Sequence, residues 1–201
     1  MNAILRSISF IFHPLFMPFF GVAFYFSKTP RYIPDSYIKA KLTALIILTI
    51  ILPLLLFYLL KTLGKVKSIY LSNVNERIIP LILNSIILVF IVLRVLPSNE
   101  FIELYFFFIG ILLSTLSCLI LALLKFKASI HMMAISGIFM FFIALSIHFS
   151  KNINGTLALF AIICGAVATS RLHLKAHSNI ELIIGFCLGF FPQLILINYW
   201  L

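Results

Sequence analysis

Long runs of apolar residues, separated by short polar gaps, dominate the chain. Seven runs approach the roughly 20 residues that a helix needs to cross a bilayer; they cover about 8–26, 42–60, 78–96, 104–124, 130–149, 155–170 and 180–200. The run 42–60 is almost continuously aliphatic, whereas a strand of a membrane barrel would alternate polar and apolar residues. The pattern therefore predicts an all-α, polytopic bundle of about six or seven transmembrane helices.

The first run differs from the others because it contains Pro14 and Pro18. Proline removes a backbone donor and breaks or kinks a helix, so this run is compatible with a kinked span, a re-entrant segment or an interfacial helix. We interpret it as part of the mature protein, since it has no clear small-residue cleavage site. We expect one membrane domain over 1–201, with a variable N-terminal run over 1–41 and a helical core over 42–201.

Composition agrees with a membrane protein. Of the 201 residues, 63% are hydrophobic and 10% are charged, and the mean hydropathy is +1.21. Fifteen Lys and Arg residues oppose five acids, but they lie in the polar gaps and form no basic stripe with exposed aromatic residues. We therefore predict lipid head groups as the acidic partner, and neither nucleic acid nor a protein partner.

The five acids are too dispersed for a magnesium or calcium site, which needs clustered carboxylates. They are Asp35, Glu76, Glu100, Glu103 and Glu181. The three cysteines lie inside apolar runs without metal-ligand or redox spacing and read as small hydrophobic residues. We expect no metal and no cofactor.

Three polar clusters, at 73–80, 125–131 and 170–181, close gaps between the predicted helices. Two predicted spans separate the first cluster from the second, and two more separate the second from the third. Because two crossings return a chain to the same side, all three clusters are expected at one membrane surface. The distribution of cations leaves open which surface this is.

The third cluster has the spacing of a nucleophile and its orienting acid. If Ser178 or Asn179 caps the last helix, His177 and Glu181 lie one turn apart, where side chains at i and i+4 meet. The carboxylate can then hold one imidazole nitrogen and leave the other free to attack. Arg171 adds a planar fork of donors suited to phosphate oxygens.

The second cluster is predicted to supply an acid. Ser129 is a good N-cap for the fifth run, which places His131 in the first helical turn beside free backbone amides that favour an anion. His131 could protonate a leaving alkoxide. Arg77, with Lys125 or Lys127, would complete a cationic cradle.

These residues resemble the signatures of the type 2 phosphatidic acid phosphatase superfamily. Ser170-Arg171, five residues, His177, three residues and Glu181 are similar to its Ser-Arg, His and Asp pattern. The segment 128–131, Ala-Ser-Ile-His, is similar to its Pro-Ser-Gly-His. Arg77 and the displaced Pro80 match part of its first signature, in which Tyr70 stands at the position of a lysine; Lys67, Lys125 or Lys127 could replace that cation.

The resemblance implies a helical core of that family and a metal-free phosphatase. It implies that His177 forms a phosphohistidine, that Glu181 orients it and that His131 is the general acid. The phosphate ligands would be Arg77, Ser129, Ser170, Arg171 and Lys127. We expect an integral multi-pass protein of a bacterial inner (plasma) membrane that hydrolyses a lipid phosphate or an isoprenyl diphosphate.

Two other functions fit parts of the sequence. A catalytically inactive lipid-phosphate binding or transport protein would have the same cationic cradle. An intramembrane serine protease would use Ser136 with His177 or His148. Outside these hypotheses, His13 and His148 are interpreted as packing or interfacial residues, and Gly155, Gly165, Gly185 and Gly189 are expected to allow close helix packing.

Overall fold

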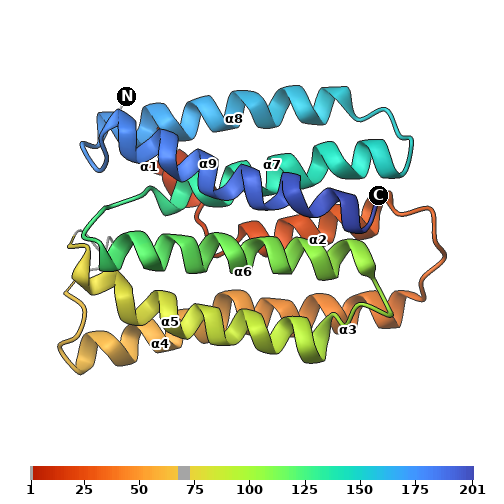
Figure 1. The fold of residues 1–201 in the computed structure, drawn as a ribbon, viewed down its shortest axis with the longest axis horizontal. Coiled ribbons are helices and arrows are strands. Elements are labelled where there is room, and N and C mark those ends of the chain that lie inside the picture. Colours follow the sequence, from red (N-terminus) through yellow and green to blue (C-terminus); the bar gives the residue numbers. More distant parts are fainter. Residues whose placement is uncertain (1, 68–72) are drawn as a thin grey trace.

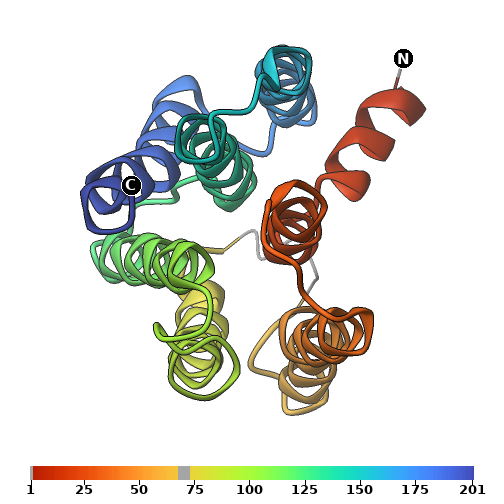
Figure 2. The same ribbon diagram turned by 90° about the vertical axis from the view of Figure 1, so that its right-hand side faces the viewer.

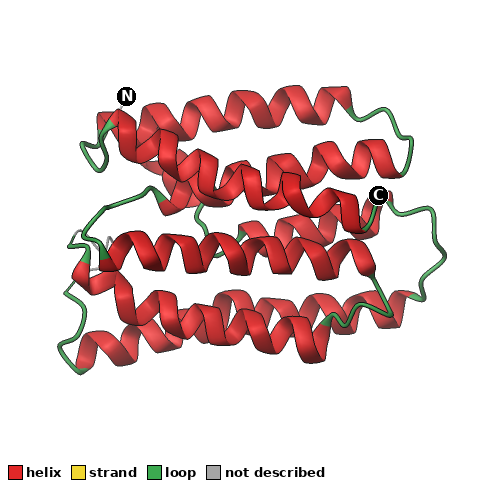
Figure 3. Cartoon of the chain, in the orientation of Figure 1, coloured by secondary structure: helices red, strands yellow, loops and turns green. Residues whose placement is uncertain are grey.

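The computed structural model describes residues 2–67 and 73–201. Helices make up most of these two ranges, and no strand occurs in them (Figure 1, Figure 3). The helices are α1 (Asn2–Ile11), α2 (Met17–Lys28), α3 (Asp35–Ile46), α4 (Leu52–Thr62), α5 (Asn75–Phe90), α6 (Ile102–Leu123), α7 (Ile130–His148), α8 (Asn154–His173) and α9 (Asn179–Leu196). The predicted all-helical fold is confirmed.

Short segments of other helical geometry join or extend these elements. A π-helical segment, Ile47–Ile51, joins α3 to α4, another, Ile91–Val95, extends α5, and a 3₁₀ turn, Ile197–Tyr199, extends α9. The first of them precedes Pro53. Because proline cannot donate to the carbonyl four residues earlier, a local widening of the helix is an expected response.

Within the described residues, six continuous helices are long and apolar enough to cross a membrane. They are Asp35–Thr62, Asn75–Val95, Ile102–Leu123, Ile130–His148, Asn154–His173 and Asn179–Tyr199. Their outer faces carry exposed large apolar side chains, among them Leu55 and Ile162, as expected for surfaces in contact with lipid. The protein is therefore an integral multi-pass membrane protein.

The first span begins at Asp35, earlier than the predicted boundary near 42. Apolar residues alone could not define this end, because the helix continues through Lys39 and Lys41 beyond its apolar part. Asp35 lies in the first turn, after Pro34, where a negative charge interacts favourably with the helix dipole.

The first apolar run forms two helices. α1 ends at Ile11 and α2 begins at Met17, and Pro14 lies in the break between them. Pro18 falls in the first turn of α2, where the missing N–H has no helical acceptor to lose. Together α1 and α2 run from the end of the bundle that holds the N-terminus to the opposite end (Figure 1), and Figure 2 shows α1 tilted out of line with α2.

Close packing between α7 and α9 depends on glycine at two positions. A Cβ on Gly185 would lie 2.6 Å from the carbonyl oxygen of Ser129, and one on Gly189 would overlap the carbonyl oxygen of Met133. These two expectations of close packing are confirmed. The same expectation is wrong for Gly155 and Gly165, where an added Cβ would meet nothing within 4 Å.

Candidate functional site

The three polar clusters lie together at one end of the bundle. α5 begins there, α6 ends where α7 begins, and α8 ends where α9 begins (left in Figure 1). A cavity of about 1140 Å³ opens between them, and its polar wall includes Arg77, Lys127, His131, Arg171 and His177. The topology inferred from the even number of spans between the clusters is therefore confirmed.

The loops before α7 and α9 share one local design. A lysine in the left-handed region follows the end of α6 and of α8, Lys125 at φ 62° and Lys175 at φ 49°, and the next backbone N–H bonds back to the helix as in a Schellman motif. A serine then caps the following helix in both loops. Each chain reversal is short, and it places Lys127 in one loop and His177 in the other on the cavity wall.

His177 is held by the acid one turn further on. Its Nδ1 lies 2.8 Å from Oε2 of Glu181. The same oxygen accepts from the backbone N–H of Ser178 at 3.1 Å, while Ser178 Oγ accepts from the backbone N–H of Glu181, which makes a capping box. Since a carboxylate accepts, Nδ1 of His177 carries the proton, and Nε2 keeps a lone pair.

Electrostatics keep His177 in this neutral form. Burial lowers the pKa of His177 to about 4, because a charged ring loses its hydration in the wall of the cavity. The hydrogen bond to Glu181 favours the protonated ring and opposes this shift, whereas Arg77, Arg171 and Lys127 add to it. The imidazole is therefore neutral near pH 7.

Two cations fix the loops as well as facing the cavity. Arg77 donates through Nη1 to the carbonyl oxygen of Ala128 at 2.8 Å, and Lys127 donates to the carbonyl oxygen of Ala176 at 3.0 Å. Burial, followed by the charge of Arg77, lowers the pKa of Lys127. The contacts tie α5 and the loop before α7 to the loop that carries His177.

The two predicted serine ligands do not line the cavity. Ser129 is fully buried, and its Oγ accepts from the backbone N–H of Met132 as the cap of α7, while its own N–H donates to the carbonyl oxygen of Glu181. Ser170 is also fully buried, and its hydroxyl donates to the carbonyl oxygen of Leu5 at 2.6 Å. In this structure both hydroxyls stabilise the helices around the site.

The N-terminal segment forms part of the site, which the sequence did not predict. Nε2 of His131 donates to the carbonyl oxygen of Ser9 at 3.2 Å, and the hydroxyls of Ser9 and Ser170 lie 2.7 Å apart. The ring of His13 meets that of His131 edge to face, at 5.3 Å between centroids, and also lines the cavity. Sequence spacing cannot predict contacts between residues more than a hundred positions apart. The one feature of the sequence that could have indicated this contact is His13, next to the helix-breaking Pro14.

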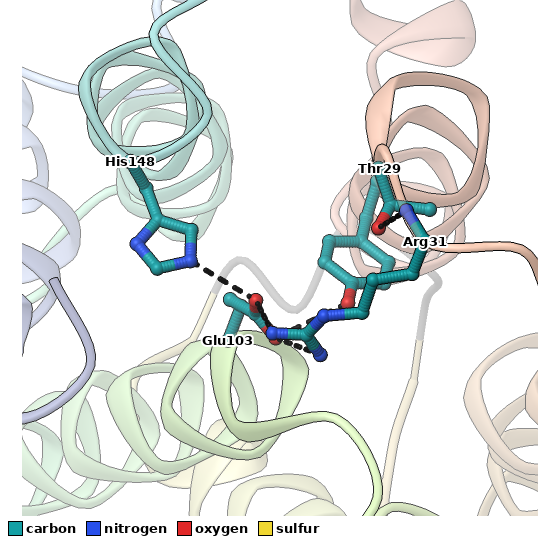
Figure 4. Close-up of polar contacts among 5 residues, drawn as sticks. Thr29, Arg31, Glu103 and His148 are labelled. Atoms are coloured by element: carbon teal, nitrogen blue, oxygen red, sulfur yellow. Dashed lines mark hydrogen bonds and ion pairs between the residues drawn. The ribbon is translucent and has the colours of Figure 1, made fainter.

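A second polar cluster (Figure 4) lies at the opposite end of the bundle, where α6 begins and α7 ends (right in Figure 1). Glu103 of α6 is fully buried and accepts from Arg31 at 2.7 Å, from His148 of α7 at 3.1 Å and from the hydroxyl of Tyr25 of α2 at 3.1 Å. The expectation that His148 is a packed residue agrees with this arrangement. The cluster fixes the end of α2 to the core.

The serine protease hypothesis fails on geometry. The hydroxyl of Ser136 is fully buried and hydrogen-bonds to the carbonyl oxygens of Met133 and Phe186. The two histidines considered as its partners, His148 and His177, are bound to glutamates at opposite ends of the bundle.

Metal-ligating side chains do not gather in the part of the chain that the structure describes: no group of three or more His, Cys, Asp or Glu could hold an ion there. Of the lysines considered as replacements for the cation of the first signature, Lys127 lines the cavity, whereas Lys67 and Lys125 do not. Tyr70, at the position of that cation, lies outside the described residues.

Beyond the cations the cavity is apolar and extends between helices. Its apolar wall comes from the segment after α1 and from α4, α5 and α6, and includes Phe16, Leu56, Phe57, Leu83, Ile87 and Ile111. The cavity is therefore cationic at the end of the bundle and apolar between the helices.

Comparisons with known proteins identify no relative of this chain. Set against protein families, curated proteins and solved structures, the chain shows no significant match. A functional assignment therefore depends on the residues of the cavity and on their chemistry.

Proposed function

We propose that the protein is a membrane-embedded phosphatase that hydrolyses a lipid phosphate or an isoprenyl diphosphate through a phosphohistidine, without a metal. One observation carries the proposal: Nδ1 of His177 is fixed by Glu181, and the ring lies on the wall of a cavity that also presents Arg77 and Arg171. The resemblance of these residues to the signatures of the type 2 phosphatidic acid phosphatases supports the same roles.

The chemistry follows from the roles of these groups. Nε2 of His177 attacks phosphorus, a P–N bond forms, and the bond from phosphorus to the leaving oxygen breaks with its electron pair on that oxygen. His131, which is protonated when the anionic phosphate is bound, gives the leaving oxygen a proton from Nδ1, because its Nε2 donates to the carbonyl oxygen of Ser9. Water then attacks the phosphohistidine, His131 takes a proton from that water, and phosphate leaves. Arg77, Arg171 and Lys127 stabilise the charge on the equatorial oxygens.

The ligand class follows from the two halves of the cavity. A soluble phosphate ester would leave the apolar wall between the helices in contact with water, which is unfavourable at roughly 25 cal/mol per Å². A lipid tail covers that wall and reaches it from the bilayer. The proposed substrates are therefore phosphate esters of long-chain alcohols or of acylglycerols.

Phosphate release by the purified protein tests the proposal. The substrates are phosphatidic acid and farnesyl diphosphate in mixed micelles, with EDTA present throughout. We expect turnover by the wild type and a loss of at least about a thousandfold in His177→Ala, because removing a nucleophile removes the covalent route. His173→Ala is the matched control, since His173 is exposed at the same end and does not line the cavity.

A chemical trap tests the intermediate separately. Protein quenched in alkali after reaction with ³²P-labelled substrate should retain label, acid should remove it, and His177→Ala should retain none. Equal activity in the wild type and in His177→Ala would refute the catalytic assignment. An inactive wild type that binds phosphatidic acid as tightly as His177→Ala does would instead identify a lipid-phosphate binding protein.

A further inference from the structure

The N-terminal helix α1 is a short element that depends on one neighbouring helix for its position. It has 10 residues, and an isolated helix of this length is marginal. Its extensive helix contacts are with α8, whereas Phe10 and Ile11, near its end, are 72% and 53% exposed. The placement of α1 relative to the core is therefore set largely by what it contacts on α8.

Two hydroxyl groups form the polar part of this contact. The hydroxyl of Ser170 donates to the carbonyl oxygen of Leu5 at 2.6 Å, and Oγ of Ser9 lies 2.7 Å from Oγ of Ser170. A hydroxyl has one proton, and that of Ser170 is used by Leu5, so Ser9 is the donor in the second bond. Because both serines are buried, these bonds form away from water, where they are stronger. One side chain of α8 thus holds a full turn of α1.

The same turn of α1 contacts His131. Since α1 ends at Ile11, the carbonyl group of Ser9 is one of the last four of the helix, which have no partner within it. This oxygen accepts from Nε2 of His131 at 3.2 Å. The ring of His13, just beyond α1, adds an edge-to-face contact with the ring of His131, at 5.3 Å between centroids.

These contacts determine which nitrogen of His131 can react. A carbonyl oxygen only accepts, so Nε2 carries a proton in either charge state of the ring, and Nδ1 is the nitrogen that exchanges a proton with the substrate. A general acid must lie within hydrogen-bond reach of the leaving oxygen. A shift of α1 would move the acceptor that orients the ring, and with it the reactive proton.

We propose that Ser170 and Ser9 are positioning residues for the general acid: their hydroxyls hold α1 against α8, so that the carbonyl group of Ser9 orients His131. This inference rests on the proposed function and adds α1 to the parts of the protein that the reaction requires. It assigns Ser170 a role different from that of a phosphate ligand, which its place in the phosphatase signature implies. The two roles predict different kinetics.

Two substrates with different leaving groups distinguish these roles. Dodecyl phosphate releases an alkoxide, which needs a proton, whereas a 4-nitrophenyl phosphate with a dodecyl chain on its ring releases a stable phenolate, which does not. We expect Ser170→Ala to lower kcat/KM about tenfold for the dodecyl ester and less than about twofold for the aryl ester. Loss of a phosphate ligand would lower kcat/KM equally for both esters, and that result would overturn the proposal.

A double-mutant cycle tests whether Ser170 acts through His131. His131→Ala removes the acid and should lower kcat/KM for the dodecyl ester by about a hundredfold or more. In that variant, Ser170→Ala should cause a further loss of less than about twofold, because residues that act through one another are not additive. A full further loss of about tenfold would show an independent effect and would contradict the positioning role.

Ser85→Ala is the matched control. The buried hydroxyl of Ser85 donates to the carbonyl oxygen of Leu81 in its own helix, and Ser85 does not line the cavity, so the ratio of kcat/KM for the two esters should not change. If Ser170→Ala does not fold, Ser9→Ala removes one hydroxyl and keeps the backbone carbonyl group. It should lower kcat/KM about threefold for the dodecyl ester alone, and an equal loss for both esters would again overturn the proposal.

The protonation of His131 provides a test that does not require turnover. In protein with ¹⁵N-labelled histidine, NMR at pH 8, where histidine is ordinarily neutral, distinguishes a proton on Nε2 from one on Nδ1, and His131→Ala assigns the signal. We expect the proton on Nε2 in the wild type and a mixture of both forms in Ser170→Ala. A proton on Nδ1 in the wild type, or an unchanged spectrum in Ser170→Ala, would refute the positioning role. Failure of the wild type to hydrolyse either ester would refute the phosphatase instead.

Discussion

The hydrogen bond between His177 and Glu181 gives the sharpest test of the proposed mechanism. In Glu181→Gln the 2.8 Å contact at Nδ1 loses its charge but keeps an acceptor of similar size. A hydrogen bond to a charged group contributes about 1.5–3 kcal/mol. If that energy is realised as the ring becomes cationic in the transition state, kcat falls about 10- to 100-fold, far less than for His177→Ala.

The pH dependence has a sign that follows from the same contact. Protonation removes the lone pair on Nε2, so kcat/KM, which reports the free enzyme, should decline as the pH falls through the pKa of His177, which is about 4. The hydrogen bond to Glu181 raises this pKa, and Glu181→Gln should therefore move the acid limb to lower pH. In the wild type and in Glu181→Gln alike, the ring of His177 is neutral at pH values above the acid limb, so the activity that requires it is retained there.

Steady-state phosphate release between pH 3.5 and 8 measures both effects. Glu76→Gln is the matched control, because Glu76 lies at the same end but accepts from the backbone N–H of Lys67 and does not line the cavity. An acid limb in the wild type near pH 6.5, the ordinary pKa of histidine, would refute the conclusion that burial lowers the pKa of His177. A limb that rises in Glu181→Gln would refute the role assigned to the carboxylate.

Three further substitutions test the packing and the charge clusters by thermal and chemical unfolding in detergent. Gly189→Ala, whose Cβ would overlap a carbonyl oxygen of α7, should lower the free energy of unfolding by about 1–3 kcal/mol; a neutral result would contradict the close packing. Gly165→Ala, which meets nothing within 4 Å, should raise it by about 0.5–1 kcal/mol through reduced backbone entropy. Glu103→Gln should lower it by about 1–3 kcal/mol, below the range for fully buried pairs because the side chain of Arg31 is 45% exposed. The more exposed ion pair of Lys41 with Glu100 should contribute less than about 1 kcal/mol, so equal losses in Glu103→Gln and Glu100→Gln would refute the importance of burial.

The sequence predicted those parts of the site that depend on local geometry. His177 and Glu181 are four residues apart on either side of a capping serine, and helix periodicity alone brings them together. The shared end of the bundle followed from counting apolar runs. Both inferences depend only on the regular geometry of a helix, which converts a number of residues into a position in space. A single sequence is therefore sufficient to make them.

The parts that the sequence could not predict depend on which helix lies opposite. Gly165 and Gly189 look alike in the sequence, but only Gly189 of the two faces a backbone carbonyl of a neighbouring helix. Ser129 and Ser170 occupy the signature positions, yet their hydroxyls bind a helix end and the N-terminal segment. His13 reaches His131 because α1 and α2 are separate helices. Apart from its two prolines, the apolar run contains no feature that predicts the break between them.

The two ends of the bundle show how charge distinguishes a structural cluster from a ligand site. At one end Glu103 accepts from three donors on different segments, and its charge is compensated within the protein (Figure 4). At the other end, Glu181 stands behind His177, while the described residues that line the cavity include five cations and no carboxylate. Like charges so placed repel one another and destabilise the fold, and an anion bound in the cavity removes that repulsion. The phosphate ester proposed as the substrate should therefore raise the unfolding temperature when it binds, by mass action.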